Sequence, residues 1–264
     1  MRLALAQLDA RLGDVEGNEE RVRSALADGA AAGADLVVFP ELFLSGYALH
    51  GIDQDTTRRP NEVAALAPGR PAALVGFHEA GHSSAAYVEA GAVVHVQRKL
   101  YLVGYPPFSE DALFEPGCEL EAFDTRLGRF AVLICNDAWQ PFLPFIAVCD
   151  GAEVLLVPAC SPTAVPDAEE VWRELTRLTA RLLQCYVVFA NRVGSEAGLT
   201  FWGGSHAVDP LGRVIAEAPR LTEALLVADL DLGSVAARRK ELPLLGPPRL
   251  DFLRAELARL ASRE

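Results

Sequence analysis

Short apolar runs alternate along this chain with stretches in which apolar residues recur every three or four positions. Apolar runs of about four to eight residues, bounded by Gly, Pro or Asp, are typical of buried strands. They predict strands near residues 2–8, 35–39, 72–77, 84–89, 92–97, 119–124, 129–134, 153–157, 186–190, 205–208, 213–217 and 225–230. The helical spacing of apolar residues predicts helices near 17–32, 141–149, 168–184, 233–240 and 249–262.

This order of elements predicts a layered α/β fold. Buried strands that alternate with amphipathic helices imply that helices cover both outer faces of the sheet material. The closely spaced strands at 84–89 and 92–97 imply a hairpin, and therefore mixed rather than purely parallel sheets. No repeat, linker or low-complexity segment divides the chain. We therefore expect one domain over residues 1–264, an α/β sandwich with a C-terminal tail helix at about 249–262.

Composition argues against a nucleic-acid or membrane partner. The chain has 264 residues, is 51% hydrophobic and carries a formal net charge of −12. A strongly acidic protein lacks the positive charge that binds nucleic acid or anionic lipid. No apolar run approaches the ~20 residues that span a bilayer, and the start of the chain turns polar too early for a secretory signal. We therefore expect a cytoplasmic protein.

Three of the predicted strands lead into reactive side chains. Glu41 follows the apolar segment 36–40, Lys99 follows 93–98, and Cys135 follows 130–134. In open α/β architectures the carboxyl ends of strands gather along one edge, so residues far apart in sequence can meet in one cleft. A thiol beside a carboxylate and an ammonium has the outline of an acyl-transfer site, with a nucleophile, a base and a cationic stabiliser.

Two further features favour this grouping. Of the 24 lysines and arginines only Lys99 and Lys240 are lysines, and Lys offers a compact ammonium that a planar guanidinium cannot replace. Lys240 lies in a charged run typical of a solvated helix face, which leaves Lys99 as the candidate. The thiol of Cys135 needs a base or a nearby cation to react at neutral pH, and no His-containing protease signature surrounds it. Glu41 is the natural base.

The other cysteines and histidines suggest no further chemistry. Five widely spaced cysteines without a Cys-x-x-Cys pair disfavour both a disulfide framework and a zinc ribbon. Cys149, Cys160 and Cys185 lie in or beside apolar segments and are expected to be inert buried thiols. The segment 78–82 spells His-Glu-x-x-His, a zinc motif that works only on a helix. Because it contains Gly81 and follows a predicted strand, we expect a turn between strands and neither a metal nor a cofactor.

The strand-end residues lie in motifs that have companions along the rest of the chain. Phe-Pro-Glu-Leu at 39–42, Arg-Lys-Leu at 98–100 and Leu-Ile-Cys-Asn-Asp at 133–137 occur in this order. They are accompanied by Gln7, Asn18 and the segments 45–47, 114–117, 190–194, 201–205 and 209–212. Each motif is modest alone, but the whole set in register resembles the nitrilase superfamily, the carbon–nitrogen hydrolases, over nearly the whole chain.

The resemblance implies a mechanism for the strand-end residues. Cys135 would attack an amide or a related carbon, Glu41 would act as the base, and Lys99 would stabilise the tetrahedral intermediate on the way to a thioester. A second active-site glutamate of the family lies seven residues before a Pro-Gly glycine, and here that position is Glu110. The backbone N–H of Asn136 would help bind the oxyanion.

The resemblance also implies a fold, an assembly and a substrate class. The family fold is a four-layer αββα sandwich that forms homodimers or larger assemblies, and the helices at 141–149 and 168–184 are the expected dimer contact. The Asn-Asp after the cysteine resembles amidases and carbamoylases rather than nitrilases proper. Tyr47 and Trp139 lie in segments similar to the glutaminase domain of glutamine-dependent NAD synthetases, and we expect both to contact substrate.

The predicted activity is hydrolysis of a small-molecule amide, with release of ammonia and a carboxylic acid. An N-carbamoyl amino-acid hydrolase or a true nitrilase remains an alternative. A glutaminase-like subunit that supplies ammonia to a partner is another, because no ATP-binding synthetase segment follows the hydrolase motifs. A zinc peptidase is the most remote alternative.

Overall fold

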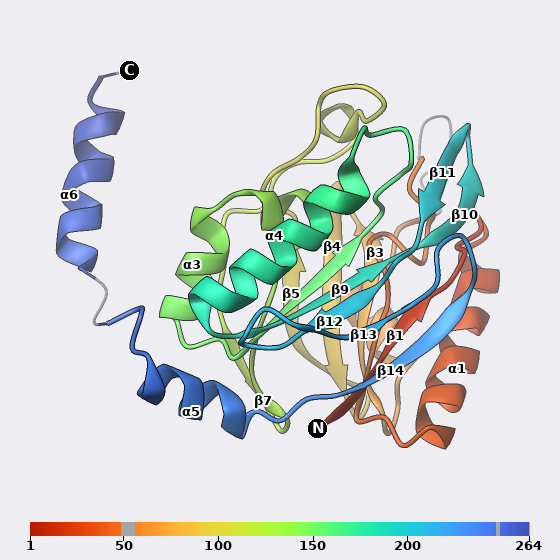
Figure 1. The fold of residues 1–264 in the computed structure, drawn as a ribbon. Coiled ribbons are helices and arrows are strands. Elements are labelled where there is room, and N and C mark those ends of the chain that lie inside the picture. Colours follow the sequence, from red (N-terminus) through yellow and green to blue (C-terminus); the bar gives the residue numbers. More distant parts are fainter. Residues whose placement is uncertain (49–55, 247–248, 264) are drawn as a thin grey trace.

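The computed structural model describes residues 1–48, 56–246 and 249–263, and within them two six-stranded sheets form the centre of the molecule (Figure 1). The first sheet contains, in spatial order, β14 (Ala224–Asp229), β1 (Arg2–Gln7), β2 (Leu36–Val38), β3 (Ala72–Glu79), β4 (His82–Glu89) and β5 (Ala92–Arg98). The second contains β13 (Val214–Glu217), β12 (His206–Val208), β9 (Tyr186–Asn191), β8 (Val154–Ala159), β7 (Gly128–Val132) and β6 (Phe123–Thr125). A separate hairpin joins β10 (Val193–Glu196) to β11 (Leu199–Trp202).

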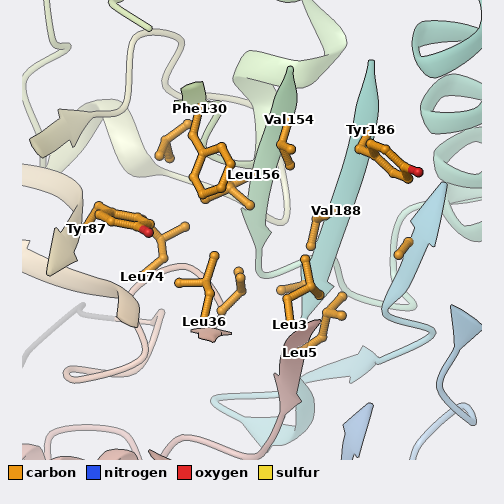
Figure 2. Close-up of a cluster of buried hydrophobic side chains, with 14 of the residues drawn as sticks. Leu3, Leu5, Leu36, Leu74, Tyr87, Phe130, Val154, Leu156, Tyr186 and Val188 are labelled. Atoms are coloured by element: carbon orange, nitrogen blue, oxygen red, sulfur yellow. The ribbon is translucent and has the colours of Figure 1, made fainter. Parts of the chain in front are cut away.

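The two sheets pack face to face through apolar side chains that alternate along their strands. Figure 2 shows this inter-sheet core, in which leucines of the first sheet meet aromatic and branched residues of the second. Buried members of the core include Leu3, Leu5, Leu36, Leu74, Tyr87, Phe130, Val154, Leu156 and Val188. Because every second residue of these strands points into the core, the residues between them point outward and need a second covering layer.

Helices provide that covering layer on both outer faces. On the first sheet, α1 (Val15–Ala31) and α2 (Pro60–Ala64) contribute to one apolar cluster with the outward residues of β1, β2 and β3. On the second sheet, α3 (Phe142–Cys149) and α4 (Ala168–Leu183) form another with β7, β8 and β9. The order helix, sheet, sheet, helix confirms the predicted four-layer αββα sandwich.

The direction of the strands brings the candidate residues to one edge. β1, β2 and β3 run parallel in the first sheet, as do β7, β8 and β9 in the second. β5 is antiparallel to β4, which is antiparallel to β3, so β5 ends at the same edge as β3. Glu41 and Lys99 therefore follow strands that end at one edge of the first sheet, and Cys135 follows a strand end of the second.

Several predicted elements differ from the observed ones. The structure also contains the short helix α2 and the hairpin β10–β11, which the sequence did not predict. Both segments are short and the hairpin contains glycine, so their apolar residues show no clear periodicity. The strand expected at 119–124 is only β6, Phe123–Thr125, because the preceding segment runs beside β5 and accepts one side-chain hydrogen bond from Gln97 instead of a ladder. The remaining predicted helices and strands are confirmed within a few residues.

The C-terminal part contains α5 (Gly233–Glu241) and α6 (Leu250–Ala261). Figure 1 shows α6 standing away from the sandwich, and none of its described side chains is buried. The tail helix is therefore where the sequence predicted it, and no described residue buries any of its side chains. Among the helices that the structure describes, none has the length and apolar character needed to cross a membrane.

Candidate active site

Lys99 lies at the centre of the site with a fully buried side chain. Its ammonium donates hydrogen bonds to Glu41 Oε1 and to Glu110 Oε1, each over 2.7 Å. Both carboxylates are themselves buried. Buried charges are costly unless they are paired and hydrogen-bonded, and here one cation satisfies two anions that lie 69 positions apart in the sequence. The structure thus brings Glu41, Lys99 and Glu110 together as one charged group.

Cys135 opens a 3₁₀ turn, Cys135–Trp139, directly beyond β7. Its φ of +48° places it in the left-handed region, which is uncommon for a residue with a Cβ and is often found at functional sites. The charges of Glu41, Lys99 and Glu110 all act on the thiol, so the sulfur lies near the charged group. The sharp turn therefore directs the sulfur at the charged group rather than into the strand's own layer.

Burial and the two carboxylates determine the charge states of the site. Burial, reinforced by the charge of Glu41, raises the pKa of the Cys135 thiol well above its usual value. Burial also raises the pKa of Glu41, and Glu110 adds to this, whereas Lys99 opposes it. Burial alone would lower the pKa of Lys99, but Glu110 and Glu41 raise it well above its usual value. The resting site therefore holds a protonated thiol and a fixed ammonium beside the Glu41 carboxylate, which can accept a proton.

Asp137 ties the cysteine turn to the segment that follows Lys99. Its Oδ1 accepts the backbone N–H groups of Leu100 and Tyr101 over 3.0 and 2.8 Å, and its Oδ2 accepts the N–H of Ile134 over 3.0 Å. Burial raises the pKa of Asp137 to about 7. One buried side chain thus fixes the position of the nucleophile relative to the ammonium.

Glu110 is held by three groups. It lies in the 3₁₀ turn Glu110–Ala112, within the long loop after β5. Its Oε2 accepts the backbone N–H of Val103 over 3.0 Å, while its Oε1 accepts both Lys99 Nζ and the phenol of Tyr47, the latter over 2.5 Å. Tyr47 is buried, and burial together with the charge of Glu110 raises its pKa well above the usual value. Tyr47 therefore contacts Glu110 directly.

The structure places the other two predicted binding residues differently. The Asn136 side chain turns toward the following loop and donates to the backbone oxygen of Tyr101 over 3.1 Å. The Trp139 ring packs edge-to-face against Trp172 of α4, with ring centroids 5.4 Å apart, at the border of the outer apolar layer. Neither side chain contacts the Lys99 group, so a role in substrate binding stays a prediction for both.

Cys160 belongs to the site, although the sequence suggested only an inert buried thiol. It is buried as expected, but its backbone N–H donates to Glu41 Oε2 over 3.2 Å and its Sγ donates to the Glu41 backbone oxygen over 3.0 Å. It directly follows β8, the parallel neighbour of β7. Its position after an apolar run is the same signal that identified Cys135, but nothing in that run indicates the backbone contact with Glu41.

The His-Glu-x-x-His segment forms two strand ends and a turn, as predicted. His78 and Glu79 close β3, and His82 opens β4. The three side chains have separate partners: His78 contacts Thr56, Glu79 pairs with Arg98, and His82 contacts the Glu115 backbone oxygen. Within the described parts of the chain no group of three His, Cys, Asp or Glu could hold a metal ion.

A small cavity of about 40 Å³ lies beside Tyr47 and Glu110. Phe108, Leu113, Phe114 and Leu199 contribute apolar walls, and the two polar side chains supply the inner end. A volume of this size accommodates one or two water molecules. The recess is mostly apolar and reaches Glu110, which binds the Lys99 ammonium.

The chain is also similar to known proteins. The profile of the carbon-nitrogen hydrolases matches residues 2–240. The chain belongs to this family, and therefore to the nitrilase superfamily. The match includes every residue of the site described above, so the shared sequence features and the site lie in the same part of the chain.

Individual relatives of this carbon-nitrogen hydrolase fall into two groups. The chain is 32% identical to a glutamine-dependent NAD(+) synthetase of Thermotoga maritima over 88% of its own length, but this spans only 42% of the synthetase. It is 33% identical to an (R)-stereoselective amidase of a Pseudomonas species, with 95% of this chain and 92% of the amidase covered.

A solved structure with a covalent ligand is also similar. A mutant of the amidase from Nesterenkonia sp. AN1, with an acetamide moiety added covalently at its active-site cysteine, matches with a TM-score of 0.79 and 27% identity. The match covers 92% of this chain and 95% of that one.

Proposed function

We propose that this protein is an amidase that hydrolyses the C–N bond of a small amide through a thioester on Cys135. The observation that carries the proposal is the buried contact of Lys99 with Glu41 and Glu110 beside a thiol on a left-handed turn. Such a group supplies a nucleophile, a proton acceptor and a fixed positive charge close together. The similarity to amidases over nearly their whole length supports the choice of substrate.

In the first half of the reaction Cys135 attacks the amide carbon. Its thiol proton passes to Glu41 as the C–S bond forms, and the carbonyl oxygen becomes an oxyanion. Lys99 Nζ and the backbone N–H of Asn136 stabilise that negative charge. As the tetrahedral intermediate collapses, the C–N bond breaks, Glu41 returns the proton to the leaving nitrogen, and ammonia or an amine departs.

In the second half a water molecule replaces the nitrogen. Glu41 removes a proton from the water, whose oxygen attacks the thioester carbon. The second tetrahedral intermediate then expels the Cys135 sulfur, which regains the proton, and the carboxylic acid leaves. Glu110 keeps the ammonium of Lys99 charged and oriented throughout, because it accepts one of the three ammonium hydrogens over 2.7 Å.

A second candidate is a glutaminase-like subunit that supplies ammonia to a partner. The similarity to NAD(+) synthetases supports it, although this chain spans less than half of those proteins. An N-carbamoyl substrate is supported by the 26% identity to an N-carbamoylputrescine amidase of Arabidopsis thaliana. These candidates share the thioester chemistry and differ only in the group bound to the reacting carbon.

Ammonia release across amides, carbamoyl compounds, nitriles and free glutamine tests the proposal. We expect turnover of small amides, and a loss of at least about 10⁴-fold in the Cys135→Ala variant, because a nucleophile's contribution is not replaced by its neighbours. Cys185→Ala, which removes a buried thiol in the apolar layer under α4, is the matched control and should retain activity. Turnover confined to nitriles, or retained without Cys135, would contradict the proposal.

We also propose that the protein works in the cytoplasm as a homodimer whose contact includes α3 and α4. Phe142 and Ile146 on α3, and Leu178 and Leu182 on α4, are large apolar side chains that are each more than 40% exposed. Their burial against a second copy would remove apolar area from water. Sedimentation velocity of the wild type and of Leu178→Glu tests this, with a monomeric variant as the expected result.

A further inference from the structure

A second buried cation lies near the site. Arg192 directly follows β9, and its guanidinium donates to Glu196 Oε2 over 2.8 Å, to Asp9 Oδ1 over 2.8 Å and to the Ala10 backbone oxygen over 2.7 Å. The side chains of Arg192 and Glu196 are 1% and 3% exposed. Removing two such charges from water costs several kcal/mol for each ion unless the new contacts compensate, so the pair calls for an explanation.

The second carboxylate oxygen of Glu196 is used by a distant part of the chain. Glu196 Oε1 accepts the backbone N–H groups of Tyr47 and Ala48 over 2.7 and 2.8 Å. An ionised carboxylate binds two amides more strongly than a neutral acceptor would. The end of β10 therefore fixes the backbone of the segment that carries Tyr47.

Arg192 also acts on the Tyr47 ring. The guanidinium carbon lies 4.3 Å from the centre of the Phe201 ring, and that ring meets the Tyr47 ring edge-on at 6.1 Å. Cation–π and edge-to-face contacts of this kind restrict ring orientation. The ion pair thus constrains Tyr47 at its backbone through Glu196 and at its ring through Phe201.

The constrained Tyr47 ends at the candidate active site. Its phenol donates to Glu110 Oε1 over 2.5 Å, and the same oxygen accepts Lys99 Nζ over 2.7 Å. A displacement of Tyr47 would therefore change the position of Glu110 and, with it, the direction in which Lys99 points.

We propose that the Arg192–Glu196 ion pair positions Glu110 against Lys99 by way of Tyr47. The inference deepens the amidase function and rests on it, since it assigns a positioning role in that same reaction. The hydrogen bonds of Arg192 and Glu196 within the described parts of the chain reach neither the thiol nor the ammonium, whereas Tyr47 connects the pair to Glu110. The charges of Arg192 and Glu196 also act on Cys160, which binds Glu41, so the Tyr47→Phe background is needed to isolate the route through Tyr47. The alternative is that the ion pair only stabilises the β10–β11 hairpin and does not affect the reaction.

A double-mutant cycle distinguishes the two. In Glu196→Gln the amide oxygen can still accept the two backbone N–H groups, but the amide nitrogen then faces Arg192, donor against donor. We expect kcat to fall about 10-fold with KM changed less than about 3-fold, as for loss of one charge-assisted contact. In a Tyr47→Phe background the same substitution should change kcat less than about 2-fold, because the connection to Glu110 is already lost.

A matched control separates this effect from a general loss of stability. Asp209 is also a buried carboxylate that binds an arginine, Arg213, and accepts backbone N–H groups, in this case from Leu211 and Arg213. It follows β12, which runs antiparallel to β9, so it lies at the opposite edge of the sheet. Asp209→Asn should lower the melting temperature and leave kcat within about 2-fold of wild type.

A readout without turnover keeps the inference separate from the proposed function. Burial and neighbouring carboxylates, including Glu110, raise the pKa of Cys135. Displacing Glu110 should therefore let iodoacetamide alkylate Cys135 at lower pH, as followed by peptide mass. Glu196→Gln should show this shift in the wild-type background and not in a Glu110→Gln background. If Glu196→Gln fails to fold, Arg192→Lys takes its place in the experiment. This variant keeps the positive charge but loses the paired N–H donors of the guanidinium.

Equal effects of Glu196→Gln in the presence and absence of Tyr47 or Glu110 would overturn the inference and favour the hairpin explanation. If the wild type hydrolyses none of the tested compounds, the proposed function fails, and the alkylation experiment still decides whether the ion pair controls Glu110.

Discussion

Two cationic side chains are buried in the described parts of the chain, each between two carboxylates, and they differ in their surroundings. Lys99 forms ion pairs with Glu41 and Glu110, both of which are buried. Arg192 has the buried Glu196 and Asp9, whose side chain is 42% exposed. Water screens the charge of Asp9, so the Arg192 group is close to neutral, whereas the Lys99 group has two buried carboxylates for one ammonium.

The two groups also differ in what their donors bind. Arg192 uses its remaining donors on the backbone of Ala10, which fixes it in place. Among the described residues the Lys99 ammonium binds two carboxylates, and the charge of one of them, Glu41, acts on the Cys135 thiol. In the Lys99 group the excess negative charge lies beside a nucleophile, so a carboxylate there can accept a proton. The Arg192 group has balanced charges and satisfied hydrogen bonds, so it can hold neighbouring residues in place. Burial alone therefore does not identify a charged residue as catalytic.

Exchange of the two cations should give the largest effect. We expect Lys99→Arg to lower kcat/KM about 10³-fold, because the planar guanidinium does not fit between Glu41 and Glu110 and an oxyanion donor is lost. Arg192→Lys should cost only about 10-fold, since it weakens support without removing a reacting group. Steady-state kinetics of both variants checks the ratio. Comparable losses would show that the two groups do not differ as described.

Removal of the negative charge of Glu110 should have the second-largest effect on the reaction. Glu110→Gln should lower kcat about 100-fold, as expected for a charge-assisted hydrogen bond to a buried ammonium. Because Glu110 raises the pKa of Glu41, the same change lowers that pKa. Glu41 would then stay ionised to lower pH, and the acid limb of kcat/KM would move to lower pH. A pH–rate profile measures this, and a limb that moves to higher pH would contradict the assigned charges.

Loosening the cysteine turn should have a smaller effect. Asp137→Asn can keep the amides of Leu100 and Tyr101 on its oxygen, but its nitrogen then faces the N–H of Ile134. We expect about a 10-fold loss of kcat, the cost of one misplaced hydrogen bond. Asp150→Asn is the control, because Asp150 accepts the N–H of Ala122 away from the site. If Asp137→Asn lowers kcat no more than Asp150→Asn does, Asp137 does not position Cys135.

The smallest effect is expected in the tail helix. Leu257 on α6 is 66% exposed and lies in a helix without buried side chains. Leu257→Gln should change kcat/KM less than about 2-fold and the free energy of unfolding by less than about 0.5 kcal/mol, as is usual for exposed positions. Chemical denaturation and kinetics of this variant set the baseline against which the effects at the two cations are judged.

The sequence predicts the layers of the fold well because burial dictates them. Val154 to Ala159 must be a buried strand, and Ala168 to Leu183 presents apolar residues on one side only, so periodicity finds both. Glu41, Lys99 and Cys135 stand out for a related reason, since each follows such a run. Glu110 needed the resemblance to a family, because nothing local distinguishes it from any other loop glutamate.

The residues that sequence reasoning missed act through backbone contacts. Cys160 binds Glu41 with its N–H, Asp137 collects three N–H groups, and Glu196 binds those of Tyr47 and Ala48. Backbone amides are identical at every position, so no pattern of side chains reveals which of them meet. Such contacts depend on the path of the loops in space, and only the folded chain displays them.

Covalent trapping tests the central claim, that the Lys99 group activates Cys135 for attack. The protein is incubated with a slowly hydrolysed amide, quenched in acid and mapped by peptide mass spectrometry across its five cysteines. We expect the mass of one acyl group on Cys135, which should be absent in Cys135→Ala and strongly reduced in Lys99→Arg. Acylation of another thiol, such as the exposed Cys118, or undiminished acylation of Cys135 in Lys99→Arg, would contradict it.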